Sequence, residues 1–184
     1  HKVLLRILSC RITDECFLNL LREIIRSFHS DKGTNKGISI GNLTSQIFAN
    51  IYLNELDRFV KYTLSSVAYL RYGDDFIILA EDREKLKLLR SKAKRFLETS
   101  LKLDLNQKND FTCKAKQGLR MLGVCLWPLQ RKLNKRNVAR IKDRLCYSNV
   151  GSYHGLVAKH ASRRIRKQFD WVVCEEFIAP PVPD

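Results

Sequence analysis

Long hydrophobic runs are absent from the 184-residue sequence. The apolar stretches are short segments such as Phe76–Ala80, well below the roughly 18 residues that a membrane-spanning helix needs. We therefore expect no membrane-embedded segment. The chain also begins at His1 without an initiator Met, a signal peptide or a polar leader, which predicts a piece of a longer polypeptide.

Cysteine patterns typical of metal sites or disulfide frameworks are also missing. No C-x-x-C pair occurs, and no His stands at zinc-finger spacing from a Cys. The six cysteines are Cys10, Cys16, Cys113, Cys125, Cys146 and Cys174. Their apolar surroundings indicate reduced, mostly structural thiols in a cytoplasmic protein, with a disulfide or a metal site as the alternative.

Acidic residues are scarce relative to basic ones. The chain has 34 Lys and Arg against 19 Asp and Glu, a net charge of +15. Residues 1–80 hold 10 basic and 8 acidic residues, whereas residues 81–184 hold 24 and 11. This surplus predicts a polyanionic partner, with nucleic acid as the first candidate and an anionic membrane surface as the alternative. The basic residues are spread over several elements, which disfavours the membrane surface.

Apolar periodicity predicts a mixture of helices and antiparallel strands, hence an α+β fold. Helices are expected over about 3–10, 14–28, 46–63 and 86–101, and strands over 67–72, 76–80, 101–105 and 119–126. Two basic segments, residues 131–144 and 159–167, are predicted to be helical. We expect three parts: residues 1–128, a basic helical part over 129–178, and an extended tail over 179–184.

Asp74 and Asp75 are the residues predicted to carry chemistry. They follow Gly73 between two β-prone runs, where adjacent carboxylates at an apolar hairpin are costly unless a cation binds. Hard oxygen ligands suit Mg²⁺, and a pair of such ions can support phosphoryl transfer. Taken alone, a Gly-Asp-Asp triplet is more often a solvated turn.

Four motifs in order resemble those of reverse transcriptases. They are the Y-x-D-D box at Tyr72–Asp75, the upstream segment 40–46, the L-x-L-N-x-x-K match at 103–108 and the F-L-G-like segment at 119–124. Within the bacterial and phage superfamily that includes group II intron and retron enzymes, the I-G-x-x-x-S-Q form is most similar to diversity-generating retroelement enzymes. The resemblance implies a right-hand polymerase palm, an antiparallel sheet with packed helices over 1–128, followed by a helical thumb.

The resemblance also implies roles for individual residues. Asp74, Asp75 and Lys108 would be catalytic, and Asp74 and Asp75 would bind metal. The dNTP and template would contact Gly41, Asn42, Ser45, Gln46, Tyr72 and Gly73. Leu122 and Gly123 would belong to the primer grip. The residues that would contact the nucleic-acid backbone are Arg131, Lys132, Lys135, Arg136, Arg140, Arg163 and Arg164. Arg71 would touch template phosphate or remain solvated.

The implied cofactor is Mg²⁺, two ions in the complete enzyme, with Mn²⁺ as the alternative. Implied partners are an RNA template, a DNA primer and cDNA, dNTPs and a small basic accessory protein. The family's first metal-binding Asp is expected just upstream of His1, so we expect the 184 residues alone to be inactive or nearly so. Two alternatives remain: an RNA-dependent RNA polymerase, and a non-catalytic nucleic-acid-binding or defence protein with a similar palm.

Overall fold

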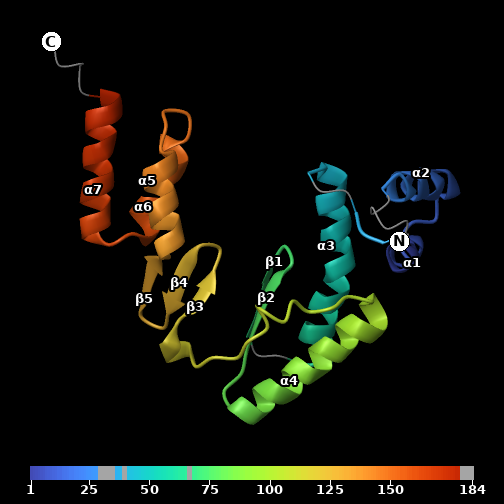
Figure 1. The fold of residues 1–184 in the computed structure, drawn as a ribbon. Coiled ribbons are helices and arrows are strands. Elements are labelled where there is room, and N and C mark those ends of the chain that lie inside the picture. The colour runs from blue at the N-terminus through green and yellow to red at the C-terminus, as the bar shows by residue number, and fades with distance from the viewer. Residues whose placement is uncertain (29–35, 39–40, 66–67, 179–184) are drawn as a thin grey trace. The chain divides into compact units, whose positions relative to one another are not determined.

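The computed structural model describes residues 1–28, 36–38, 41–65 and 68–178. It combines helices with small antiparallel sheets, so the predicted α+β class is confirmed (Figure 1). The chain divides into two compact units, His1–Asp110 and Phe111–Asp184, which are described separately. This division lies before the predicted boundary at residue 128, and the predicted tail at 179–184 falls outside the described residues.

The helices of the first unit match the predicted ones closely. They are α1 (Lys2–Ser9), α2 (Glu15–Arg26), α3 (Leu43–Arg58) and α4 (Arg83–Phe96), and the last two continue into π-helical turns at Phe59–Thr63 and Leu97–Leu101. Side chains cap two of the helices: Asp14 accepts a hydrogen bond from the Phe17 N–H, and Asp82 accepts one from the Lys85 N–H. Such caps satisfy N–H groups that the first helical turn leaves unpaired.

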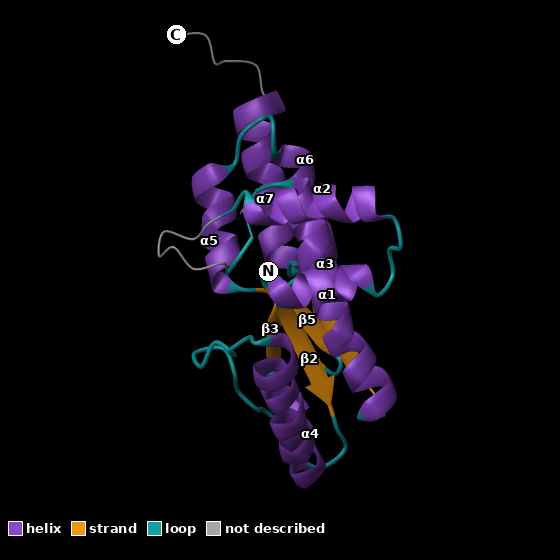
Figure 2. Ribbon diagram, turned by 90° about the vertical axis from the view of Figure 1, so that its right-hand side faces the viewer, coloured by secondary structure: helices purple, strands orange, loops and turns teal. Residues whose placement is uncertain are grey.

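Two apolar clusters hold the first unit together. One joins α1, α2 and α3 through Leu4, Leu8, Leu18, Leu21, Ile25 and Phe48. The other is centred on Leu56, Val60, Leu97 and Leu101, and it receives Tyr69, Phe76 and Ile78 from a hairpin made of β1 (Ala68–Tyr72) and β2 (Asp75–Leu79). Figure 2 shows α4 beside β2. The hairpin is therefore fixed on one face by the helices.

The predicted strand over 101–105 is wrong. Leu101 closes the π-helical turn, and Lys102 leaves it with a positive φ of 54°. The Leu103 N–H then donates to the Leu97 carbonyl at 3.0 Å. Leu103 and Leu105 pack against the second cluster from an irregular segment. The alternation of leucines therefore reflects alternate burial and not strand pairing.

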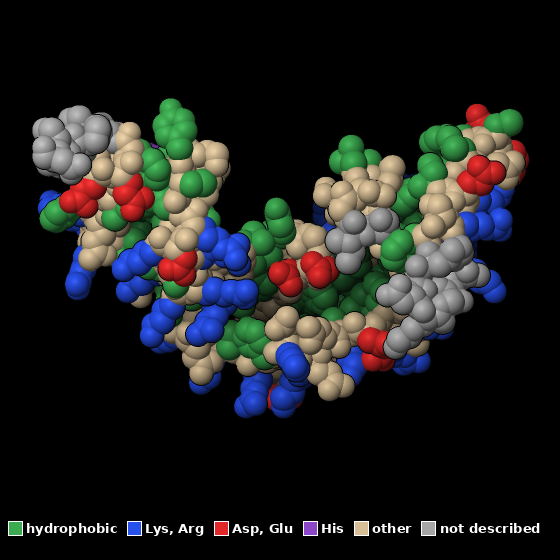
Figure 3. All heavy atoms as spheres, turned by 45° about the horizontal axis from the view of Figure 1, so that its top comes forward, with side chains coloured by type: hydrophobic (Ala, Val, Ile, Leu, Met, Phe, Trp, Pro, Cys, Tyr) green, Lys and Arg blue, Asp and Glu red, His purple; other side chains and the backbone are tan. Residues whose placement is uncertain are grey.

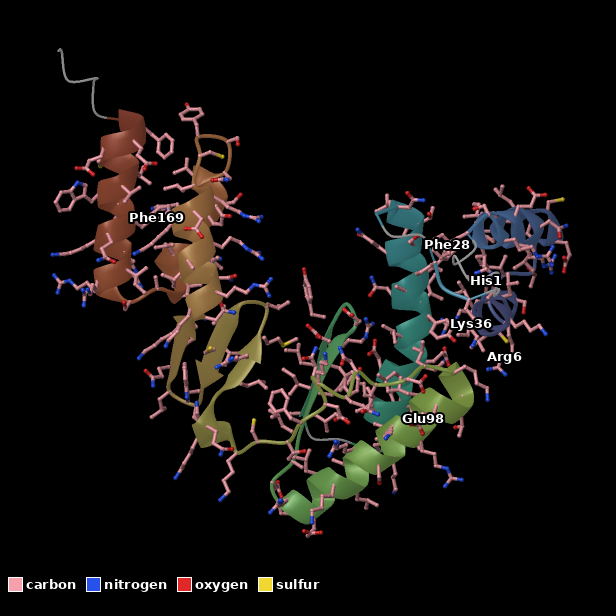
Figure 4. All side chains as sticks on the ribbon, viewed as in Figure 1. His1, Arg6, Phe28, Lys36, Glu98 and Phe169 are labelled. Carbon is pink, nitrogen blue, oxygen red and sulfur yellow. The ribbon has the colours of Figure 1, made fainter. Side chains whose placement is uncertain are left out.

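The second unit places helices against a three-stranded sheet of order β3–β4–β5. The strands are β3 (Leu119–Met121), β4 (Val124–Trp127) and β5 (Gln130–Leu133), and the helices are α5 (Lys135–Arg144), α6 (Val150–His160) and α7 (Arg163–Val173), which continues into a π-helical turn at Cys174–Ile178. Val124 and Leu133 of the sheet share one core with Val157 of α6 and Phe169 of α7. Figure 4 labels Phe169. This shared core explains why the sheet belongs to the second unit.

Two helix predictions for the second unit and the prediction for the cysteines of both units need correction. Residues 131–133 are not helical; they lie in β5, which pairs with β4. The predicted helix over 159–167 is interrupted at Ala161 and Ser162, between α6 and α7. Cys10, Cys16, Cys146 and Cys174 are exposed rather than packed in apolar surroundings. Cys113 and Cys125 are partly buried, and all six thiols are unpaired. Within the described ranges, no helix has both the length and the apolarity required to cross a membrane.

Candidate functional site

The candidate site begins with the tight turn that joins β1 and β2. Tyr72 lies opposite Asp75 in the antiparallel register, so Gly73 and Asp74 form a two-residue turn. Gly73 has φ +61°, while Asp74 is not among the residues with positive φ. These signs match a type II′ turn, which favours Gly at its first position. A Cβ at Gly73 would meet no atom within 4 Å, so backbone conformation, not space, requires this glycine.

Asp74 and Asp75 are both exposed to solvent at the hairpin tip. The expectation that burial makes these carboxylates costly is therefore wrong, because water solvates them. Asp75 shares one hairpin face with Leu70, Tyr72 and Leu79, whose exposures are 55%, 64% and 54%. The turn thus presents two adjacent carboxylates at the end of an uncovered apolar face.

An arginine network ties this turn to α3. The Arg71 guanidinium donates from Nε to Asp57 Oδ1 at 2.7 Å and from Nη2 to Asp57 Oδ2 at 2.6 Å. Its Nη1 donates to Asn50 Oδ1 at 3.1 Å and to the Gly73 carbonyl at 2.9 Å. Asn50 and Asp57 lie two helical turns apart on one face of α3. Arg71 therefore connects a helix face directly to the backbone of the turn.

Electrostatics favour the ionised forms of Asp57 and Arg71 and the neutral form of Tyr69. Burial raises the pKa of Asp57, but hydrogen bonds from Arg71 and Tyr69 outweigh burial and lower it overall. The hydrogen bond to Asp57 raises the pKa of Arg71. Burial, followed by the hydrogen bond to Asp57 at 2.7 Å, raises the pKa of Tyr69. The Arg71 side chain is only 12% exposed, so it is neither solvated nor free to grip template phosphate.

Four of the predicted dNTP and template residues lie on α3 or directly before it, whereas Tyr72 and Gly73 belong to the hairpin. Asn42, Gln46 and Asn50 recur at intervals of one helical turn, so they share the face that carries Asp57. Asn42 and Gln46 are exposed. Ser45 points elsewhere and is 8% exposed, within the packed interior. Gly41 precedes the helix with φ +97°. The structure therefore groups Asn42 and Gln46 with the face that binds Arg71, and it places Ser45 in the packed interior.

Lys108 lies in an exposed loop after the second cluster. Its N–H donates to Asn106 Oδ1 at 3.1 Å, and Asp110 follows two residues later in the same loop. Arg90 of α4 binds that carboxylate with two hydrogen bonds of 2.9 Å. The position of the loop is therefore set by an ion pair to α4.

The predicted primer-grip residues form the turn between β3 and β4. Met121 pairs with Val124, which leaves Leu122 and Gly123 as a two-residue turn with φ +51° and +79°. A bulky residue such as Leu122 rarely adopts a positive φ. Its side chain is 54% exposed. The Gly123 carbonyl accepts from the Asn134 N–H at 3.0 Å and from Asn137 Nδ2 at 3.3 Å. The turn is thereby anchored on the start of α5.

The predicted backbone-contacting cations all lie exposed in the second unit, where Figure 3 shows Lys and Arg side chains gathered. Arg131 and Lys132 project from opposite faces of β5, because successive strand residues alternate. Across the sheet, Arg120 and Lys132 flank Cys125 on one face. Arg120 was not predicted from the sequence to join these cations. Its register with the basic strand β5 across β4 would have indicated it. Over the described part of the chain, every ion pair belongs to the first unit.

Arg163 and Arg164 occupy the first turn of α7. Ser162 caps this helix by accepting from the Ile165 N–H at 3.4 Å. Two cations at a helix N-terminus oppose the helix dipole, so helix stability does not explain their position. A bound anion would offset that unfavourable interaction.

The described residues supply only part of a metal-binding ligand set. They contain no group of three or more His, Cys, Asp or Glu side chains arranged to hold an ion. Asp74 and Asp75 nevertheless fit Mg²⁺, which usually takes one or two carboxylates and completes its shell with water and substrate phosphates.

Comparisons with known proteins give distant relatives. No family model matches the chain. Protein YkfC of Escherichia coli is 28% identical over 142 residues, covering 58% of this chain and 37% of its own length. The putative COX1/OXI3 intron 2 protein of Saccharomyces cerevisiae is 35% identical over 66 residues, 33% of this chain and 8% of its own. An uncharacterized 91 kDa protein in the cob intron of Schizosaccharomyces pombe is 33% identical over 73 residues, 38% and 9% respectively. The chain thus spans a minor part of each relative.

Proposed function

We propose that this protein is part of an RNA-directed DNA polymerase, a reverse transcriptase of the diversity-generating retroelement type. The observation that carries the proposal is the Gly73–Asp74 turn, which presents Asp74 and Asp75 side by side and is held to α3 through Arg71. In this proposal, residues 1–128 supply part of a polymerase palm and residues 129–178 supply the thumb.

Each group of residues has a role in the proposed reaction. Asp74 and Asp75 would hold Mg²⁺, with Mn²⁺ as a substitute, and the metal would supply charge neutralisation for phosphoryl transfer. Asn42 and Gln46, on the α3 face beside Arg71, would orient dNTP and template. Lys108 would approach the leaving pyrophosphate. The cations of α5 and α7 would hold the RNA template and DNA primer by their phosphates.

The names of two relatives favour a retroelement setting. Two relatives are named as intron proteins, and their matches cover 33% and 38% of this chain. The partners proposed for the complete protein are an RNA template, a DNA primer with its cDNA, dNTPs and a small basic accessory protein.

Primer extension tests the proposal. The full-length protein is assayed on an RNA template with Mg²⁺ and either dNTPs or NTPs. The double variant Asp74→Ala, Asp75→Ala should lower the rate of primer extension by at least about 10³-fold, because it removes the metal ligands. The matched control is Glu175→Ala, Glu176→Ala, which deletes two adjacent exposed carboxylates in the second unit.

The outcomes separate the candidate functions. Extension with dNTPs that only the Asp74, Asp75 variant abolishes supports the reverse transcriptase. Extension with NTPs would indicate an RNA polymerase instead. Salt-sensitive primer–template binding without extension would indicate a non-catalytic binding protein. The cations of the second unit, which form no ion pair among the described residues, favour this alternative.

A further inference from the structure

A cleft of about 400 Å³ lies in the first unit, away from the hairpin turn. Its walls come from α1, the end of α3 and the end of α4. Three arginines and one carboxylate line it together with an apolar floor. These residues are Arg6, Arg11, Arg58, Glu55, Phe96 and Leu101. Arg6 is labelled on α1 in Figure 4.

The charges in this cleft are unbalanced. A single Glu55 oxygen lies 3.9 Å from Arg11 Nη2 and 3.8 Å from Arg58 Nη1, so both ion pairs are long and share one acceptor. Arg6 has no acidic group within ion-pair distance among the described residues. The Arg11 and Arg58 side chains are 55% and 56% exposed. One carboxylate therefore faces three guanidinium groups that remain open to solvent.

The cleft and the hairpin use different sides of α3. Glu55 and Arg58 lie about one helical turn apart and face the cleft. Asp57, which binds Arg71 of the hairpin, lies two residues from Glu55, a rotation of about 200° around the helix axis. A ligand in the cleft is therefore not the substrate of the hairpin turn.

We propose that this arginine cleft binds the phosphate of a nucleotide, either free or within a nucleic-acid strand. Planar guanidinium groups donate paired hydrogen bonds to phosphate oxygens, and three of them exceed what Glu55 can neutralise. The partly buried Phe96 ring offers an apolar surface for the sugar and base. This proposal does not depend on polymerase activity at Asp74 and Asp75.

Site-specific NMR titration of the 184-residue chain tests the proposal. The Nε–Hε signals of Arg6, Arg11 and Arg58 are assigned from single Arg→Gln variants and followed with two probes, uridine monophosphate and a ten-residue oligouridylate. All three signals should shift in a saturable way. The triple variant Arg6→Gln, Arg11→Gln, Arg58→Gln should bind the responding probe about 10-fold more weakly at the cleft, as reported by the Ser100 amide.

Two further variants keep the test independent of folding. Glu55→Gln removes the competing carboxylate and should strengthen binding about threefold, a gain that misfolding cannot produce. Arg26→Gln with Arg83→Gln, two exposed helical arginines outside the cleft, should leave the affinity unchanged. If only the oligonucleotide shifts the signals, the cleft binds a nucleic-acid strand. If both probes shift them, the cleft binds nucleotides in general. No saturable shift with either probe, or unchanged binding in the Glu55 variant, overturns the proposal.

Discussion

The two units use their charged residues in opposite ways. In the first unit, Arg71 is bound by Asp57 and Arg90 by Asp110, each through two hydrogen bonds. In the second unit, the exposed cations of β5, α5 and α7 form no ion pair within the described residues. Arg71 and Arg90 of the first unit therefore fix backbone segments, whereas the exposed cations on β5, α5 and the start of α7 remain available to an anionic partner.

The largest expected effect comes from breaking the Arg71 network. Arg71→Ala leaves the partly buried Asp57 carboxylate without its bidentate partner, and we expect a loss of about 2–3 kcal/mol in the free energy of unfolding. Urea unfolding measures this loss. Arg90→Ala is the matched control: its side chain is 47% exposed, and we expect less than about 1 kcal/mol. Equal losses in both variants would contradict the structural role assigned to Arg71.

A charge-removal variant of α5 tests the availability of the second unit's cations. Lys135→Gln, Arg136→Gln, Arg140→Gln should weaken binding to a primer–template duplex about 10-fold and flatten its salt dependence, because phosphate contacts are lost. Fluorescence anisotropy at several salt concentrations measures both quantities. The control is Lys85→Gln, Lys87→Gln, Lys94→Gln on α4, where two lysines already pair with glutamates. The idea fails if the α4 variant loses as much affinity.

The pH dependence of stability sharpens the role of Asp57. Its folded-state pKa is lowered, so its ionised form stabilises the fold above the unfolded pKa of 3.8, and this contribution disappears as the pH falls through the folded value. The stability difference between the wild type and Asp57→Asn should therefore be about 1 kcal/mol or more near pH 7 and shrink below pH ~4. Unfolding at both pH values measures it. A difference that is constant with pH would rule out the ionised pair as its source.

The smallest expected effect concerns the two hairpin turns. Gly73 of the first unit adopts its positive φ without steric strain, whereas Leu122 of the second unit adopts a positive φ with strain from its Cβ atom. Leu122→Gly should raise stability by about 0.5 kcal/mol, because relief of strain exceeds the entropy cost of glycine. The same substitution in strand β4, Leu126→Gly, should lower stability. If thermal melting shows that Leu122→Gly is destabilising, then contacts of this side chain outweigh its strain.

Local sequence signals predicted much of the first unit. Helical periodicity and the two β-prone runs around Gly73-Asp74 depend on neighbouring residues, so the helices and the hairpin were identified correctly. The strand predicted over 101–105 failed because alternate burial looks the same in an irregular segment. Strand β5 was missed because three of its four residues, Gln130–Leu133, are polar and only pairing with β4 makes them a strand.

The sequence by itself determined the type and approximate limits of the long helices, the hairpin with its two carboxylates and the concentration of positive charge after residue 80. These properties follow from local conformational preference and composition. Only the tertiary structure decided that Asp57 and Asn50 of α3 bind Arg71, that Ser45 is buried and Asp74 exposed, and that the sheet of the second unit packs on its helices. These outcomes depend on contacts between segments distant in the chain, whose geometry arises when apolar faces pack together.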